Sequence, residues 1–322
     1  MKCKITGDKL SPFMSFGKMP SANGFLDENN FDKEFFYKME VGFSNKVSLL
    51  QLNEFSNPVK VHNDRYPFYT SSSINMKKHF NQFAHWLKEK YLHNGSKLIE
   101  VGSNDGTLLE NFKNTNIEAV GFEPSITIAE LANKKNIKTL SKFFNTQNLD
   151  EIRNFHSSVD VICSANVIAH IPDLKDVIKC VDKLLSSKGL LIFEEPYLGS
   201  MFSKISYDQI YDEHIFMFSV NSIKKIFDLF DFELIDVLPQ VTHGGSMRYV
   251  IARKNKHKKS EIVSRFIDEE QSKKLDTIES CLEFKKACEL SKKMTIEKLN
   301  KFKGLKISYA IIYGGFLIFS SK

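Results

Sequence analysis

The sequence predicts an α/β fold in which a mostly parallel, Rossmann-like sheet is covered by helices on both faces. Short apolar runs alternate with helical patterns from residue 97 onward, which is typical of such a sheet. The first run, residues 97–101, leads into a turn with two glycines, a common feature of ligand-binding strand ends. The last two runs, residues 232–238 and 247–252, follow one another without a helix, so we expect an antiparallel edge pair.

Hydrophobic periodicity places the remaining elements of this core. Apolar residues three and four positions apart predict a helix over residues 76–91, before the first strand. Further helices are expected to start near Leu108, after the glycine turn, and after Asn221. The other predicted strands are residues 119–122, 159–167 and 190–194, and residues 137–140 are a strand or a turn. The other predicted helices are residues 126–135, 146–155 and 173–185, with a turn at 186–189.

The segments on either side of this core have a different pattern. Residues 1–75 carry many Phe and Asn residues and frequent turn signals, which indicates a small irregular lobe or a long arm. Residues 256–302 are charged and helical in pattern, and residues 309–319 form a short apolar run with two glycines. We therefore divide the chain into an N-terminal lobe (1–75), a core (76–254) and a helical C-terminal extension (255–322).

Composition argues against several classes of protein. No stretch approaches about 18 consecutive apolar residues and the polar start lacks a signal sequence, so we expect a cytoplasmic protein without a membrane partner.

The five cysteines are scattered without a CxxC pair, which predicts neither a disulfide framework nor a zinc site. The net charge of +6 comes from residues 253–306, where 16 Lys and Arg face 9 Asp and Glu. This mixed-sign helical stretch lacks interleaved aromatic residues, so no nucleic-acid partner is expected.

The turn after the first strand points to a cofactor site. Its sequence, Glu100-Val-Gly102-Ser-Asn-Asp105-Gly106, lets a ligand approach the backbone closely at two glycines. The spacing is looser than the GxGxxG of dinucleotide-binding proteins, and Glu123 ends the second strand about 20 residues on, where a carboxylate accepts hydrogen bonds from ribose hydroxyls. We expect S-adenosylmethionine (SAM) as the cofactor; a dinucleotide-binding sheet and a turn without a ligand are the alternatives. The expected contacts are Gly102, Gly106 and Glu123, with Asp105 and Asn166 in second rank.

Ionisable residues gather after the later strands, where ligands bind in such sheets. His170 follows the strand over residues 159–167, and Tyr211, Glu213 and His214 lie in an otherwise apolar segment. Histidine is the side chain best matched to proton removal at neutral pH, so His214 is the candidate base, with Tyr211 as its hydroxyl partner. A packed structural role stays open for both histidines. Glu194 and Glu195 are either substrate contacts or caps of a loop.

Six motifs together resemble those of the sugar C-methyltransferases, which methylate carbon 3 of dTDP-4-keto-deoxysugars. The motifs are Glu100-Val-Gly-Ser-Asn-Asp-Gly106, Gly121-Phe-Glu-Pro124, Ala165-Asn-Val-Ile-Ala-His-Ile-Pro-Asp173, Glu195-Pro-Tyr197, Tyr211-Asp-Glu-His-Ile-Phe216 and His243-Gly-Gly-Ser-Met-Arg248. The resemblance implies the class I SAM-methyltransferase fold and a nucleotide-sugar substrate. It implies that His214 removes the carbon 3 proton, with Tyr211 and Glu213 beside it and His170 as a second imidazole. Tyr66 or Tyr69 would reach over the substrate, and Tyr197 and Arg248 would contact it.

Two segments depart from the pattern of that family. Its N-terminal lobe holds zinc through two CxxC pairs, whereas the matching positions here are Cys3-Lys-Ile-Thr6 and Ser44-Asn-Lys-Val47, so we expect no metal. Family members also continue into a further C-terminal lobe, which predicts that this chain is shortened. The alternatives to a sugar C-methyltransferase are an O- or N-methyltransferase of surface-polysaccharide sugars and a SAM-binding remnant without activity.

Overall fold

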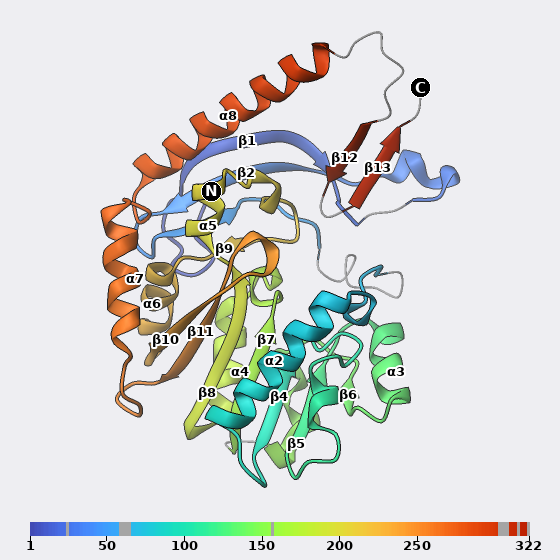
Figure 1. The fold of residues 1–322 in the computed structure, drawn as a ribbon, viewed down its shortest axis with the longest axis vertical. Coiled ribbons are helices and arrows are strands. Elements are labelled where there is room, and N and C mark those ends of the chain that lie inside the picture. Colours follow the sequence, from blue (N-terminus) through green and yellow to red (C-terminus); the bar gives the residue numbers. More distant parts are fainter. Residues whose placement is uncertain (24–25, 58–65, 156–157, 302–308, 314–315, 321–322) are drawn as a thin grey trace.

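A computed structural model describes residues 1–23, 26–57, 66–155, 158–301, 309–313 and 316–320 (Figure 1). Its centre is a seven-stranded sheet in the order β10-β11-β8-β7-β4-β5-β6. The strands are β4 (Lys97–Val101), β5 (Glu118–Phe122), β6 (Thr139–Leu140), β7 (Val159–Ala165), β8 (Leu185–Pro196), β10 (Phe232–Gln240) and β11 (Ser246–Arg253). The first five pair in parallel, whereas β11 runs antiparallel to both β8 and β10. The predicted parallel sheet with an antiparallel edge pair is therefore confirmed.

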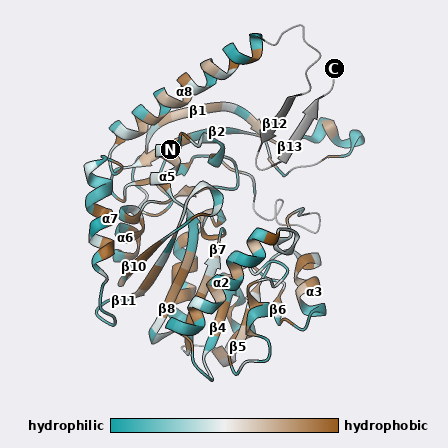
Figure 2. Cartoon of the chain, in the orientation of Figure 1, coloured by the Kyte–Doolittle hydropathy of each residue, from teal (hydrophilic) through white to brown (hydrophobic). Residues whose placement is uncertain are grey.

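Helices cover both faces of this sheet, as the alternating pattern predicts. On one face α2 (Ile74–Lys90) and α3 (Ile126–Lys134) contribute to a core that includes Phe83 and Leu98. On the other face α4 (Leu174–Leu184), α6 (Val220–Asp228) and α7 (Glu261–Ser272) pack around Phe193. Hydrophobic residues concentrate in the strands, while hydrophilic residues lie on the helices' outer sides (Figure 2).

Three predicted core elements differ from the structure. The helices expected near Leu108 and over residues 146–155 are 3-10 helices, η3 (Leu109–Phe112) and η4 (Thr146–Phe155), and η4 is broken at Ile152. The turn at 186–189 is a bulge inside β8, because the pairing with β7 passes from Leu185 directly to Leu190 over two residues of β7. Gly189 is required in that bulge, since a Cβ there would lie 2.6 Å from the carbonyl oxygen of Val159.

The N-terminal segment folds as a lobe, one of the two forms expected, but the lobe is a sheet and not irregular. It consists of β1 (Ser11–Pro20), β2 (Phe36–Ser44), β3 (Leu49–Leu52) and the short β9 (Phe216–Met217), all antiparallel. Register shifts interrupt the pairing of β1 with β2, and such bulges hide the two-residue alternation by which strands are identified in a sequence. Because β9 belongs to the Tyr211–Phe216 motif region, this lobe is joined directly to the segment that carries the candidate base.

The C-terminal extension is helical as predicted and ends in a hairpin. Helix α8 (Ile278–Lys301) crosses the lobe (Figure 1). Its Phe284 belongs to the same buried cluster as Phe13 of β1. Strands β12 (Tyr309–Tyr313) and β13 (Phe316–Ser320) form the hairpin, and the glycines Gly314 and Gly315 lie outside the described residues. The remaining short elements are η1 (Glu28–Lys33), η2 (Thr70–Ser72), η5 (Ile168–His170), α5 (Leu198–Lys204), η6 (Tyr207–Gln209) and η7 (Thr242–Gly244). Across the described part of the chain, every helix is too short or too polar to cross a membrane.

Candidate active site

The glycine turn after β4 has the geometry of a ligand cradle. Gly102 and Gly106 have φ angles of +69° and +80°, which other residues rarely adopt. A Cβ on Gly102 would lie 2.3 Å from Val167, and one on Gly106 would lie 2.7 Å from Ile137. The turn therefore packs against its neighbours only because both positions lack a side chain.

Carboxylate and amide oxygens surround this turn. Glu123 is 5% exposed, and its two oxygens accept hydrogen bonds from the backbone N–H groups of Asn104 (3.0 Å) and Ser125 (2.9 Å). Burial raises the pKa of Glu123 in spite of these donors. Among the described residues, Glu100 Oε2 and Asn166 Oδ1 are buried without a hydrogen-bond partner. Since buried polar atoms are normally satisfied, these oxygens fit a site that a polar ligand completes.

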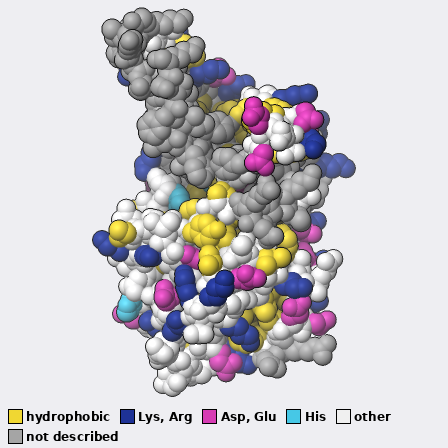
Figure 3. Space-filling model, turned by 90° about the vertical axis from the view of Figure 1, so that its right-hand side faces the viewer, with side chains coloured by type: hydrophobic (Ala, Val, Ile, Leu, Met, Phe, Trp, Pro, Cys, Tyr) yellow, Lys and Arg dark blue, Asp and Glu magenta, His cyan; other side chains and the backbone are white. Residues whose placement is uncertain are grey.

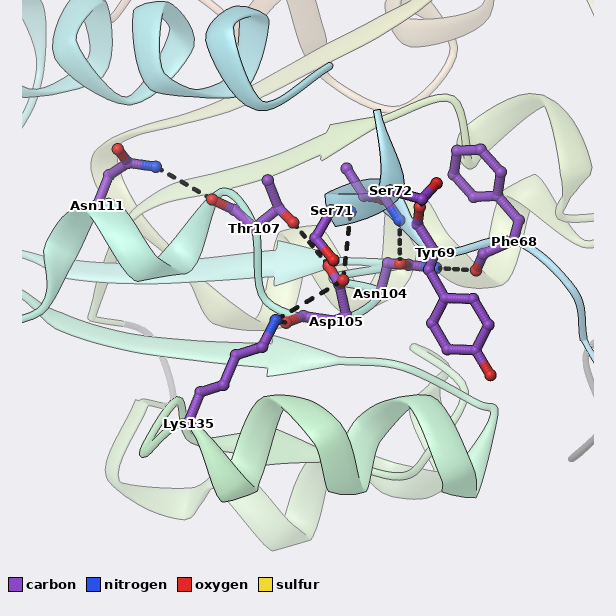
Figure 4. A network of polar contacts seen from close by, with 10 residues as sticks. Phe68, Tyr69, Ser71, Ser72, Asn104, Asp105, Thr107, Asn111 and Lys135 are labelled. Atoms are coloured by element: carbon purple, nitrogen blue, oxygen red, sulfur yellow. Dashed lines mark hydrogen bonds and ion pairs between the residues drawn. The ribbon is translucent and has the colours of Figure 1, made fainter. Parts of the chain in front are cut away.

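The segment that contains the two arm tyrosines is fastened to the same turn (Figure 4). Asn104 Oδ1 accepts the backbone N–H of Thr70 at 2.8 Å, and Asp105 Oδ2 accepts that of Ser71 at 3.2 Å. Asp105 also accepts the Thr107 hydroxyl at 2.6 Å. Burial opposes its ionisation, yet these hydrogen bonds lower the pKa of Asp105. The Asp105 carboxylate thus holds the arm, and a cofactor contact for it stays a prediction.

The candidate base lies in a second group of side chains. His214 is 7% exposed, and its Nδ1 lies 2.7 Å from the backbone carbonyl oxygen of Gln209. A carbonyl oxygen only accepts, so Nδ1 carries the proton and Nε2 presents a lone pair. That lone pair lies 3.3 Å from the Tyr211 hydroxyl, which can donate to it. The arrangement is that of a neutral imidazole whose Nε2 accepts a hydrogen bond.

A second imidazole and a carboxylate complete the group. The rings of His170 and His214 are 5.1 Å apart, and His170 Nδ1 lies 3.5 Å from Glu213 Oε2. Tyr66 donates a hydrogen bond to Glu213 as well. The structure thus brings Tyr66 to this group, whereas the ring of Tyr69 points away from the contacts of the glycine turn (Figure 4).

Burial determines the protonation states in this group. Burial and the neighbouring His170 lower the pKa of His214 to about 3, and burial lowers the pKa of His170 to about 4. Burial and the Glu213 carboxylate raise the pKa of the Tyr211 and Tyr66 hydroxyls. At neutral pH, therefore, both imidazoles are neutral and both tyrosines are protonated.

Two predicted substrate contacts have other partners in the structure. The Tyr197 hydroxyl donates to Glu270 of α7 at 2.8 Å, although the Tyr197 ring lines the same small pocket as His214. Arg248 is 5% exposed and donates to Glu194 Oε1 from Nε at 2.7 Å, with its guanidinium 4.0 Å from the centre of the Phe83 ring. These contacts give Arg248 a structural role beneath α2.

The structure also distinguishes the two glutamates at the end of β8. Glu195 Oε1 accepts the backbone N–H groups of Val167 (3.0 Å) and Ala169 (3.2 Å), so it caps the loop that leads to His170. Burial raises the pKa of Glu195 to about 8. Glu194 pairs with Arg248 and with His79, a residue of α2 that sequence analysis missed because nothing in a helical pattern reveals a buried ion pair.

The N-terminal lobe does not fit a tetrahedral zinc site. Around the Cys3 thiol lie the hydroxyls of Thr6 and Ser44 and the amide of Gln51, whose Nε2 is 3.3 Å from Sγ. In the described part of the chain, no three His, Cys, Asp or Glu side chains converge as a metal site would require. One thiolate is too few for a structural zinc, which takes four ligands, mostly Cys and His.

We expect the purified protein to carry no stoichiometric zinc, because Thr6, Ser44 and Val47 supply none of the missing thiolates. Elemental analysis of protein grown in zinc-supplemented medium checks this, with a chelator-treated sample as the control. One zinc per chain that resists the chelator would contradict it.

Charges of both signs are interspersed on the surface. Figure 3 shows Lys and Arg beside Asp and Glu over the described part of the face it draws.

Three family models and one characterised relative match this chain. A family model described as "Methyltransferase domain" matches residues 76–237, one described as "Putative zinc binding domain" matches residues 3–61, and one described as "C-methyltransferase C-terminal domain" matches residues 241–314. The chain is 28% identical over 249 residues to the C-methyltransferase NovU of Streptomyces niveus, an alignment that covers 76% of this chain and 59% of NovU.

Solved structures with a similar fold have low sequence identity. The PH0226 protein of Pyrococcus horikoshii is 14% identical, with a TM-score of 0.45 over 58% of this chain and 95% of that protein. The magnesium protoporphyrin IX methyltransferase of Synechocystis with bound SAH is 14% identical, with a TM-score of 0.44 over 56% of this chain and 84% of that enzyme.

Proposed function

Because this chain belongs to the SAM-dependent methyltransferase family, we propose that it is a C-methyltransferase that acts on a nucleotide-linked keto-sugar. Its fold is the class I SAM-methyltransferase fold, with a mostly parallel Rossmann-like sheet and one antiparallel strand inserted beside the edge. The observation that carries the proposal is the neutral His214, whose Nε2 lone pair faces Tyr211 at the ligand-binding edge of the sheet. A base of this kind serves carbon methylation, which begins with removal of a proton from carbon.

The glycine turn is the proposed cofactor site. SAM would lie along the turn that Gly102 and Gly106 shape, and Glu123 would accept hydrogen bonds from its ribose, since each carboxylate oxygen keeps a lone pair beyond its backbone donor. Glu100 and Asn166 offer the buried oxygens that still lack partners among the described residues. When bound, SAM supplies an electrophilic methyl group.

The second group of residues does the proton chemistry in this proposal. His214 Nε2 removes the proton from the carbon next to the ketone, and the Gln209 carbonyl stabilises the imidazolium that forms. Tyr211, protonated at neutral pH, donates a hydrogen bond to the developing enolate oxygen or to the ketone from which it forms. The enolate carbon formed in this way would be the nucleophile for the methyl group, whose bond to the SAM sulfur would break to leave S-adenosylhomocysteine. Glu213 holds His170 and Tyr66 around the reacting carbon.

The substrate class rests on the six motifs that resemble the sugar C-methyltransferases, and the similarity to NovU supports the C-methyltransfer reaction. The chain spans about 59% of NovU's length, so activity of the 322-residue chain itself is part of the proposal. We further propose a cytoplasmic enzyme that needs neither a membrane nor a nucleic acid as partner.

Mass spectrometry of the protein incubated with SAM and a panel of nucleotide 4-keto-sugars tests the proposal. We expect a mass gain of one methyl group on one sugar, with loss of deuterium from a sugar labelled next to the ketone. Methylation with full retention of that deuterium would favour an O- or N-methyltransferase. Calorimetry that detects SAM binding but no sugar-nucleotide binding would favour a remnant that binds cofactor without turnover.

We expect Glu123→Ala to weaken SAM binding by about 1.5–3 kcal/mol, the usual range for hydrogen bonds to a charged group. Calorimetric titration with SAM measures the loss. Glu118→Ala, an exposed residue at the start of the same strand β5, is the matched control and should bind SAM like the parent. Unchanged affinity in a folded Glu123→Ala protein would refute the ribose contact.

A further inference from the structure

A turn of the N-terminal lobe reaches into the second group of residues. Just after β1, the Ser21 hydroxyl donates to Asp212 Oδ2 at 2.8 Å, and the backbone N–H of Ala22 lies 3.2 Å from Asp212 Oδ1. The side-chain amide of Asn23 donates to Glu213 Oε1. Three consecutive residues of the lobe thus bind two consecutive carboxylates beside the candidate base.

Both sides of this contact are held by other interactions. The Ser56 hydroxyl donates to the Ser21 hydroxyl at 2.8 Å, which anchors the turn within the lobe. On the other side, β9 pairs with β3, and the backbone N–H of Leu52 donates to the carbonyl of Ile215 at 2.9 Å. Asp212 and Glu213 are only 1% and 5% exposed. The turn and the segment with the two carboxylates are therefore each tied to other parts of the N-terminal lobe.

Glu213 is the point where the lobe and the proton chemistry meet. One oxygen, Oε1, accepts from Asn23, while Oε2 lies 3.5 Å from His170 Nδ1. Tyr66 donates to the same carboxylate. An amide NH₂ group is a donor only, so Asn23 fixes which oxygen is left for His170. Without it, Oε1 loses the donor that fixes its position, and only His170 and Tyr66 orient the carboxylate.

We propose that Asn23 is a positioning residue that orients Glu213 and, through it, His170 and Tyr66 for the reaction. The inference rests on the proposed function for its kinetic part. Its structural part, that Asn23 sets the surroundings of His170, can be tested without any turnover. The N-terminal lobe would then be a part of the active-site frame.

Kinetics of Asn23→Ala and Asn23→Asp test the proposal at pH 8 and at pH 9, because the Glu213 carboxylate raises the pKa of the introduced Asp above its ordinary value of about 3.9. Loss of one charge-assisted hydrogen bond should lower kcat about 10- to 100-fold, with little change in the KM for SAM. Asn23→Asp keeps the shape but places a carboxylate against Glu213, so it should lose more activity than Asn23→Ala. Asn45→Ala and Asn45→Asp are the controls, because Asn45 is an exposed residue of the same lobe.

A packing role would give the opposite order, with the isosteric Asn23→Asp more active than Asn23→Ala, and that result would overturn the proposal. The second readout is the NMR spectrum of the histidine rings. We expect Asn23→Ala to shift the resonances of His170 while those of the half-buried His257, which contacts the Lys188 carbonyl, stay unchanged. Unshifted His170 resonances would also overturn it. If no sugar of the panel is methylated, the proposed function fails, yet the NMR result still decides the role of Asn23.

Discussion

Replacement of His214 by Ala is expected to abolish most methyl transfer while SAM still binds. General-base catalysis contributes about 10²- to 10⁴-fold to a rate, so the loss should be large without being total. SAM affinity should change little, because Gly102, Gly106 and Glu123 follow β4 and β5 whereas His214 lies between η6 and β9. Single-turnover kinetics and calorimetry on the same sample measure the two quantities.

Tyr211→Phe separates the hydroxyl from the imidazole in this prediction. Tyr211→Phe should lower the rate of methyl transfer less than His214→Ala does. The Nε2 lone pair stays in place when the Tyr211 hydroxyl, 3.3 Å away, is removed. The double variant should lose less activation free energy than the sum of the two single variants, as expected for groups that act as a unit. A His214→Ala protein that still exchanges the proton next to the ketone at the parent rate would eliminate His214 as the base.

The sequence predicted the core of this fold because its strands are uniform apolar runs separated by helices. The run at residues 97–101 becomes β4 with the same bounds, and the run at 159–167 becomes β7, shortened by two residues. The N-terminal lobe could not be predicted in the same way. Its strands are bulged, and one of them, β9, comes from a segment more than 150 residues away in the chain.

The part of the candidate site that is contiguous in the sequence was predictable, whereas the part assembled from distant segments was not. Tyr211, Glu213 and His214 stand together in the sequence, so their common location follows from the chain. Asn23 and His79 reach carboxylates 190 and 115 residues away, and only the folded arrangement of lobe, helix and sheet brings these partners together. Neither residue belongs to a pattern that a single sequence reveals.

Replacement of Glu194 by Ala is expected to destabilise the fold by about 3–5 kcal/mol, the cost of leaving one partner of a buried ion pair uncompensated. Glu194 is 1% exposed and accepts from Arg248 Nε at 2.7 Å and from His79 at 2.5 Å. Its loss leaves the guanidinium of Arg248 buried against aromatic rings without a counter-charge. Urea unfolding at pH 7 measures the change in the free energy of unfolding.

The matched control is Glu269→Ala, which breaks the exposed i,i+4 pair with Lys273 and should cost no more than about 0.5 kcal/mol. The pH dependence gives a second check. Burial opposes the ionisation of Glu194, but the His79 hydrogen bond and the Arg248 charge lower its pKa below the ordinary 4.5. The stability contributed by this ionisation is therefore complete above about pH 4.5 and is lost as the pH falls through the folded-state value. The free energies of unfolding of the parent and of Glu194→Ala should therefore become similar in acid. Equal stabilities of Glu194→Ala and Glu269→Ala at pH 7 would show that the buried pair does not hold β8 to β11 and α2.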